Sequence, residues 1–109
     1  MKTTGAVAIL AVLMFSPGVV VAGDAVAGKV VFMKKCATCH AEDGNGKPAV
    51  AKMMKTTIPA LPSKDVQAIS DDDMRKGIIS GKEKMKPIKD LSAADIANVI
   101  AYVRSLAKS

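Results

Sequence analysis

The segment Cys36-Ala37-Thr38-Cys39-His40 constrains this chain more than any other part of its sequence. It holds both cysteines of the chain and its one histidine. A Cys-x-x-Cys-His spacing places two thiols within reach of the two vinyl groups of one haem, with the imidazole beside the iron. The motif therefore predicts one haem c, attached through Cys36 and Cys39, with His40 as an axial ligand of the iron.

Other uses of the same cysteines compete with haem attachment. A thioredoxin-like redox pair usually opens a helix after a strand, whereas this pair follows a helical segment. A structural disulfide between Cys36 and Cys39 stays open at this stage. A closed zinc site normally has four protein ligands, and the two cysteines and His40 supply only three.

Residues 1–22 resemble a signal peptide. Lys2 provides a positive start, residues 5–15 are apolar apart from glycine, and Ala22 suits signal peptidase. The alternative is an uncleaved anchor, because residues 5–22 approach the length of a membrane span, but Pro17 and its neighbours interrupt the run. We expect cleavage after Ala22, which leaves residues 23–109 as one periplasmic, monomeric domain without stable membrane insertion.

A domain of this size buries a small share of its surface and needs an additional stabiliser. After residue 22 its only aromatic residues are Phe32 and Tyr102, so a central apolar cofactor would supply the missing core. The whole chain has a formal net charge of +6. Without aromatic side chains for base stacking, this charge is poor evidence for nucleic acid and better evidence for acidic partner proteins.

The hydrophobic pattern predicts an all-α fold with short helices. One helix is expected from about residue 25 to 35, with Asp24 as its N-cap. A second is expected at about 71–80 after Ser70, and Gly81 ends it. The last begins with Ser92 and Asp95, and it carries an apolar stripe at helical spacing, formed by Ile96, Val99, Val103 and Leu106. Residues 41–63 contain glycine and proline punctuation and are expected to form a loop.

The second axial ligand has to be sought among the methionines, because a chain with one histidine cannot supply two imidazoles. A methionine thioether favours reduced iron and raises the reduction potential. The candidates are Met33, Met53, Met54, Met74 and Met85. Met85 is favoured, because it follows Gly81 in a loop that Pro87 stiffens. Chemistry alone does not exclude Met53 and Met54.

In order and spacing, these features resemble the class I cytochromes c, the small soluble bacterial type. The resemblance covers residues 24–106 and includes Gly28, Phe32, the haem motif, Pro59-Ala60-Leu61, the methionine loop at 81–87 and Tyr102. It implies that the N- and C-terminal helices cross, with Gly28 and Phe32 against the face that carries Tyr102. It also implies that the Pro59 carbonyl accepts a hydrogen bond from the second imidazole nitrogen of His40.

A haem with two protein ligands leaves no open iron site for a substrate, so we expect a one-electron carrier and not an enzyme. Two alternatives stay open: a haem sensor with a displaceable sixth ligand, and an electron-transfer subunit of a larger oxidoreductase. Two groups of lysines suggest where a partner docks. One group lies before and after the haem motif and consists of Lys34, Lys35, Lys52 and Lys55. The other surrounds Met85 and is called the lysine cluster; it consists of Lys82, Lys84, Lys86 and Lys89. This cluster is either an ordinary solvated surface or a docking surface for an acidic redox partner.

Overall fold

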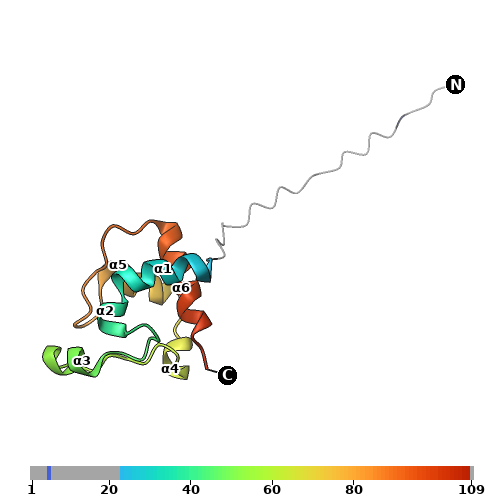
Figure 1. Cartoon of the computed structure of the whole chain (residues 1–109). Coiled ribbons are helices and arrows are strands. Elements are labelled where there is room, and N and C mark those ends of the chain that lie inside the picture. Colours follow the sequence, from blue (N-terminus) through green and yellow to red (C-terminus); the bar gives the residue numbers. More distant parts are fainter. Residues whose placement is uncertain (1–4, 6–22, 109) are drawn as a thin grey trace.

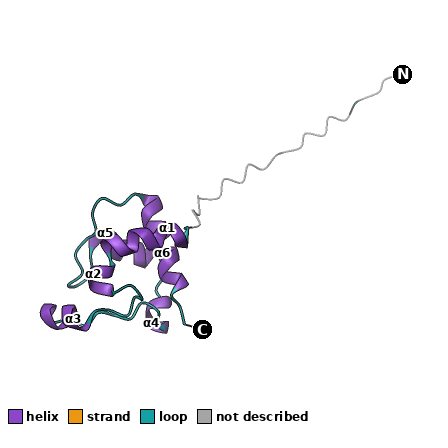
Figure 2. Cartoon of the chain, viewed as in Figure 1, coloured by secondary structure: helices purple, strands orange, loops and turns teal. Residues whose placement is uncertain are grey.

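The computed structural model describes Gly5 and residues 23–108, and Figure 1 traces their course. In order, the helices are α1 (Ala25–Lys35), α2 (Ala37–His40), α3 (Pro48–Met54), α4 (Lys64–Gln67), α5 (Asp71–Ser80) and α6 (Ala93–Ser105). Figure 2 shows that loops join these helices and that the described residues contain no strand. The predicted all-α class is confirmed. The predicted signal peptide lies outside the described residues.

The helices that the sequence predicts best begin at side-chain caps. The Asp24 carboxylate accepts hydrogen bonds from the Val26 amide at 2.8 Å and the Ala27 amide at 3.3 Å. At the start of α6, Ser92 and Asp95 each accept the other's amide at 3.0 Å. Such caps pair amides that the first turn of a helix leaves free. The boundaries of α1 and α6 are therefore encoded locally.

α1 and α6 cross at backbone contact distance. Gly28 is buried in α1, and a Cβ atom there would overlap the backbone carbonyl of Asn98 in α6. The Asn98 side chain also accepts a hydrogen bond from the Asp24 amide at 2.8 Å. Because only glycine leaves room for this approach, the predicted crossing of the terminal helices is confirmed. The backbones of α1 and α6 come closest at Asn98, one helical turn before Tyr102.

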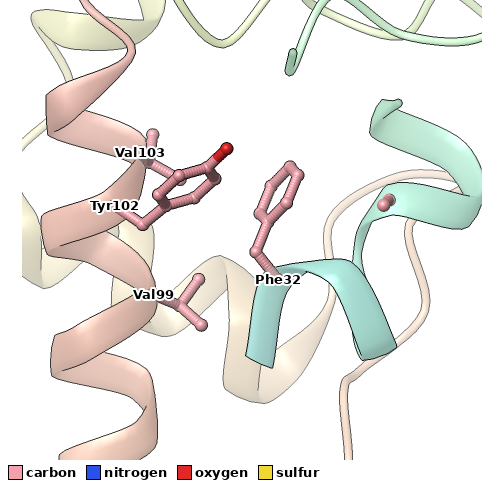
Figure 3. Close-up of a cluster of buried hydrophobic side chains, with 5 residues drawn as sticks. Phe32, Val99, Tyr102 and Val103 are labelled. Atoms are coloured by element: carbon pink, nitrogen blue, oxygen red, sulfur yellow. The ribbon is translucent and has the colours of Figure 1, made fainter. Parts of the chain in front are cut away.

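The core lies beside this crossing. Figure 3 shows Phe32 of α1 facing Val99, Tyr102 and Val103 of α6. Phe32 is only 1% exposed, and its ring centre lies 5.0 Å from that of Tyr102, with the planes tilted by 54°. This separation is favourable for an aromatic pair. The Tyr102 hydroxyl donates to the Glu42 carbonyl at 3.2 Å, so α6 also holds the segment that follows the haem motif.

The expectation that residues 41–63 form only a loop is wrong, because α3 lies within them. Pro48 occupies the first turn of α3, where a missing amide costs no helical hydrogen bond. Lys55 ends the helix in the left-handed region, with φ of 52°. Met53 and Met54 thus belong to a helix. α3 has no buried residue, and Figure 1 shows it at the edge of the molecule, away from the crossing.

Candidate functional site: a haem cavity

A cavity of about 870 Å³ lies between the haem motif and the loop that carries Met85. Its walls come from the α1–α2 junction, residues 54–61, residues 66–78, the loop at 82–88 and the inner face of α6. Its volume is in the upper part of the range for ligand sites. The site is therefore large enough to receive a cofactor, and it brings together parts of the chain that are distant in sequence.

The haem motif forms one helical turn on the cavity wall. The Cys36 amide donates to the Phe32 carbonyl at 2.8 Å, and the His40 amide donates to the Cys36 carbonyl at 3.0 Å. Residues three and four apart on such a turn share one face, so Cys39 and His40 both lie near Cys36. All three residues line the cavity and are partly buried. The predicted attachment residues are thus brought together.

The local chemistry argues against the competing uses of these cysteines. Burial, reinforced by nearby Cys39, raises the pKa of the Cys36 thiol to about 11. A thioredoxin-like pair depends on a thiol with a depressed pKa, so this environment is the wrong one for it. Cys36 and Cys39 are free thiols and form no disulfide with each other. Among the described residues, no group of three metal-binding side chains converges as a zinc site would require.

His40 is suited to bind a metal. Burial lowers its pKa, which favours the neutral imidazole that metals require. Its Nδ1 is buried without a hydrogen-bond partner among the described residues. Buried polar atoms are seldom left unpaired. The His40 ring can therefore still form bonds to a cofactor and to a neighbouring group that turns toward it. Pro59 lines the same cavity, but no hydrogen bond joins it to His40 in the described part of the chain.

The loop after α5 presents Met85 on a tight turn. The backbone groups of Lys82 and Met85 exchange two hydrogen bonds, each 2.9 Å long. Gly81 precedes this turn with φ of 79°, and a Cβ atom there would lie 2.7 Å from the Met85 carbonyl oxygen. The Ile88 amide then donates to the Ile78 carbonyl at 2.9 Å, which fastens the loop to α5. Met85 is therefore held at the cavity by bonds on both sides.

The structure narrows the choice of methionine. Met54, Met74 and Met85 line the cavity. Met33 packs against the core instead, and Met53 is 76% exposed on the outer side of α3. Of the cavity methionines, Met85 alone lies on a loop, while the other two lie in α3 and α5.

Some cavity residues escaped the sequence analysis. Val66, Ile69 and Ile100 line the cavity, although none was predicted to do so. Ile100 could have been found, because it lies four residues after Ile96 and extends the apolar side of the last helix. Val66 and Ile69 lie in and after a single-turn helix, which is too short for a periodic signal.

Comparison with known proteins agrees with this geometry. Residues 25–107 match the family Cytochrome c. The chain belongs to the cytochrome c family. It is 34% identical to cytochrome c6 of Rippkaea orientalis over 100 residues, 91% of this chain and 84% of the relative. It is 32% identical to cytochrome c-554(547) of Halothiobacillus neapolitanus over 93 residues, 78% of this chain and 99% of the relative.

A solved structure supports the same conclusion. The c-type cytochrome KustC0563 superposes with a TM-score of 0.64 and 25% identity, covering 74% of this chain and 98% of the other. As a cytochrome c, this protein carries one covalently bound haem c with its iron and transfers electrons. The largely apolar cavity, its paired thiols and its neutral imidazole fit that group.

The exposed residues that line the cavity on the loop at 82–86 are mostly basic in this cytochrome, with Glu83 among the lysines. All four residues of the lysine cluster are exposed, and Lys82, Lys84 and Lys86 also line the cavity.

None of the described helices is both long and apolar enough to cross a membrane.

Proposed function

We propose that this cytochrome c is an exported one-electron carrier whose iron is bound by His40 and Met85. The observation that carries the proposal is the cavity itself, with the haem motif in one wall and the clamped Met85 turn in another. When bound, haem c supplies an iron that exchanges one electron between its ferrous and ferric states. A carrier of this kind takes its electron from a donor protein and passes it to an acceptor protein.

Each residue of the site has a separate task in this proposal. Cys36 and Cys39 hold the macrocycle through thioether bonds, and His40 binds the iron as a neutral imidazole. The Pro59 carbonyl accepts a hydrogen bond from the N–H of the second imidazole nitrogen, which fixes the ring and strengthens it as a ligand. The Met85 thioether favours ferrous iron, and the apolar wall excludes water.

A pyridine haemochrome assay tests the attachment. We expect one c-type haem per chain, and we expect it to stay with the protein in acidified acetone because thioether bonds are covalent. Haem that passes into the solvent would contradict attachment through Cys36 and Cys39.

The ligand assignment is tested by Met85→Ala. We expect it to abolish the methionine–iron(III) charge-transfer band and to lower the midpoint potential, because ferrous iron loses its preferred ligand. Met53→Ala and Met54→Ala are the controls and should keep both properties. Loss of the band in Met54→Ala alone would show that the ligand is Met54 of α3 and not Met85.

Carbon monoxide binding tests the alternative function. Rapid binding by the wild-type protein at neutral pH would favour a haem sensor over a carrier.

We propose that the partner docks on the lysine cluster through acidic side chains. A basic surface beside the cavity mouth would steer such a partner toward the haem edge and raise the association rate at low salt. Changing Lys84 and Lys86 to glutamate should slow electron transfer to the partner and weaken its salt dependence. Lys29→Glu on α1 is the matched control, because Lys29 is exposed but lies outside the cluster.

Export has its own test. Mass spectrometry of protein from the periplasmic fraction should give a chain that begins at Gly23. A full-length chain in the membrane fraction would contradict cleavage after Ala22 and support an anchor.

A further inference from the structure

We propose that Gln67 and Arg104 are positioning residues that hold one wall of the haem cavity and thereby limit the access of water to the haem. This inference rests on the haem-carrying role of the cavity, and it concerns residues that touch neither the iron nor the attachment motif. The side chains of Gln67 and Arg104, with the groups to which they donate hydrogen bonds, form a network behind the cavity wall, and the proposal assigns a function to this network.

Arg104, in the last turn of α6, bonds to the segment between α4 and α5. Its Nη1 donates to the Gln67 carbonyl at 2.8 Å, and its Nη2 donates to the Ile69 carbonyl. Its Nε and Nη2 also donate to one carboxylate oxygen of Asp71, at 3.1 and 2.8 Å. All three guanidinium nitrogens therefore have partners, and the planar fork of arginine suits such a set of acceptors.

Gln67 extends the network toward the other side of the cavity. Its side-chain amide nitrogen donates to the Leu61 carbonyl and to the Val103 carbonyl, each at 2.9 Å. The Leu61 amide in turn donates to the Gly44 carbonyl at 2.9 Å, in the segment that follows His40. One side chain thus joins α6 to the Pro59–Leu61 segment.

The bonded residues are themselves part of the cavity wall. Leu61, Ile69 and Val103 all line the cavity. α4 is a single turn of four residues, and such a short helix has little stability of its own. The position of this wall therefore depends on tertiary contacts, and the side chains of Gln67 and Arg104 provide seven hydrogen bonds to it.

A loosened wall would change the haem environment in a defined direction. Exposure to solvent is one of the factors that set the potential of a haem. Water stabilises the more highly charged ferric site, because its high dielectric favours charge. Loss of the network should therefore lower the midpoint potential and let external ligands reach the iron faster.

Two variants separate this effect from simple electrostatics. Gln67→Leu removes both side-chain donors without changing the charge of the protein. Arg104→Lys keeps the positive charge but cannot reproduce the fork of bonds. Arg75→Lys is the matched control, because Arg75 forms an exposed ion pair with Asp72 on α5, outside the network.

The experiment uses the purified holoprotein of each variant. We measure the midpoint potential by redox titration, the rate of carbon monoxide binding to the reduced protein, and amide hydrogen exchange at residues 59–71. Gln67→Leu and Arg104→Lys should lower the potential, speed ligand binding and speed exchange in that segment. Arg75→Lys should match the wild type in all three measurements.

The proposal is overturned if both variants keep the wild-type potential and exchange rates, even if their denaturation midpoints fall. If Gln67→Leu yields no folded protein, Arg104→Lys decides alone. Haem content and the methionine band are recorded for the wild type in the same series. Their absence would contradict the proposed function, whereas a wild-type spectrum with unchanged variants would contradict only the role of the network.

Discussion

The α1–α6 crossing and α3 are both helical, yet they are stabilised in different ways. At the crossing, Gly28 meets the backbone of Asn98 and no space is left for a side chain. α3 has no buried residue and carries Met53, whose side chain is 76% exposed. The crossing is fixed by close tertiary packing, whereas α3 lacks such packing and is bounded only by Pro48 in its first turn and by Lys55 at its end.

This difference shows where the fold is sensitive to change. Close-packed regions lose stability when volume is added or removed, because their neighbours cannot move freely. Exposed regions tolerate substitution. The haem cavity borders both kinds of region, since Phe32 of α1 and Met54 of α3 line it.

The largest effect is expected when haem attachment is prevented, because the haem cavity borders both α1 and α3. Replacing Cys36 and Cys39 together by serine should abolish stable holoprotein, because the haem fills a cavity that a domain of this size cannot leave empty. Haem stain on a denaturing gel and circular dichroism measure the outcome. A folded, haem-bearing double variant would show that the thioether bonds are dispensable.

Gly28→Val tests the crossing directly. Overpacking costs about 1–3 kcal/mol, and the upper part of this range is expected because the new side chain meets backbone. Denaturation of the holoprotein by guanidinium measures the loss. Lys29→Val introduces the same residue at the next, exposed position and should cost only about 0.4 kcal/mol of helix propensity. A Gly28→Ala variant as stable as the wild type would contradict the close approach.

Ser92→Ala should have an intermediate effect. It removes half of the capping box of α6 and leaves the Asp95 amide without its partner, at a cost of about 1 kcal/mol. Ser80→Ala, at the exposed end of α5, is the control and should stay within about 0.5 kcal/mol. Equal effects of the two substitutions would mean that the cap adds nothing to the packing of α6.

The smallest effect is expected for Met53→Ala on α3. Its exposed side chain should leave the free energy of unfolding within about 0.5 kcal/mol of the wild type, with the potential unchanged. The same denaturation and redox titrations measure it. A loss as large as that of Gly28→Val would show that α3 packs more closely than its exposure indicates.

Local signals in the sequence were sufficient for the three longest helices, α1, α5 and α6. Asp24, Ser70 and Ser92 marked the starts of α1, α5 and α6, because a capping side chain acts within three residues of itself. α3 differs from the loop that glycine and proline punctuation predicts, because proline is also favoured at the first helical position, which Pro48 occupies.

The candidate site was only partly predictable for a similar reason. Cys36, Cys39 and His40 lie within one turn, so their spacing alone brings them together. The network behind the cavity joins Gln67 to Arg104 across 37 residues, and no periodicity in either segment indicates that pairing. The partners of the Arg104 guanidinium lie in α4, in α5 and between them, outside the helix that carries it.

The crossing has a consequence for the order in which this chain can fold. Phe32 lies near the start of the domain, while Val99 and Tyr102 belong to the final helix, so the core joins the two ends of the sequence. Contacts of such long range form slowly, because most of the chain must be enclosed as a loop first. Tyr102, the ring of α6 that packs on Phe32, enters the chain only after nearly all other residues of the domain. The protein therefore cannot complete its core before almost the whole chain exists.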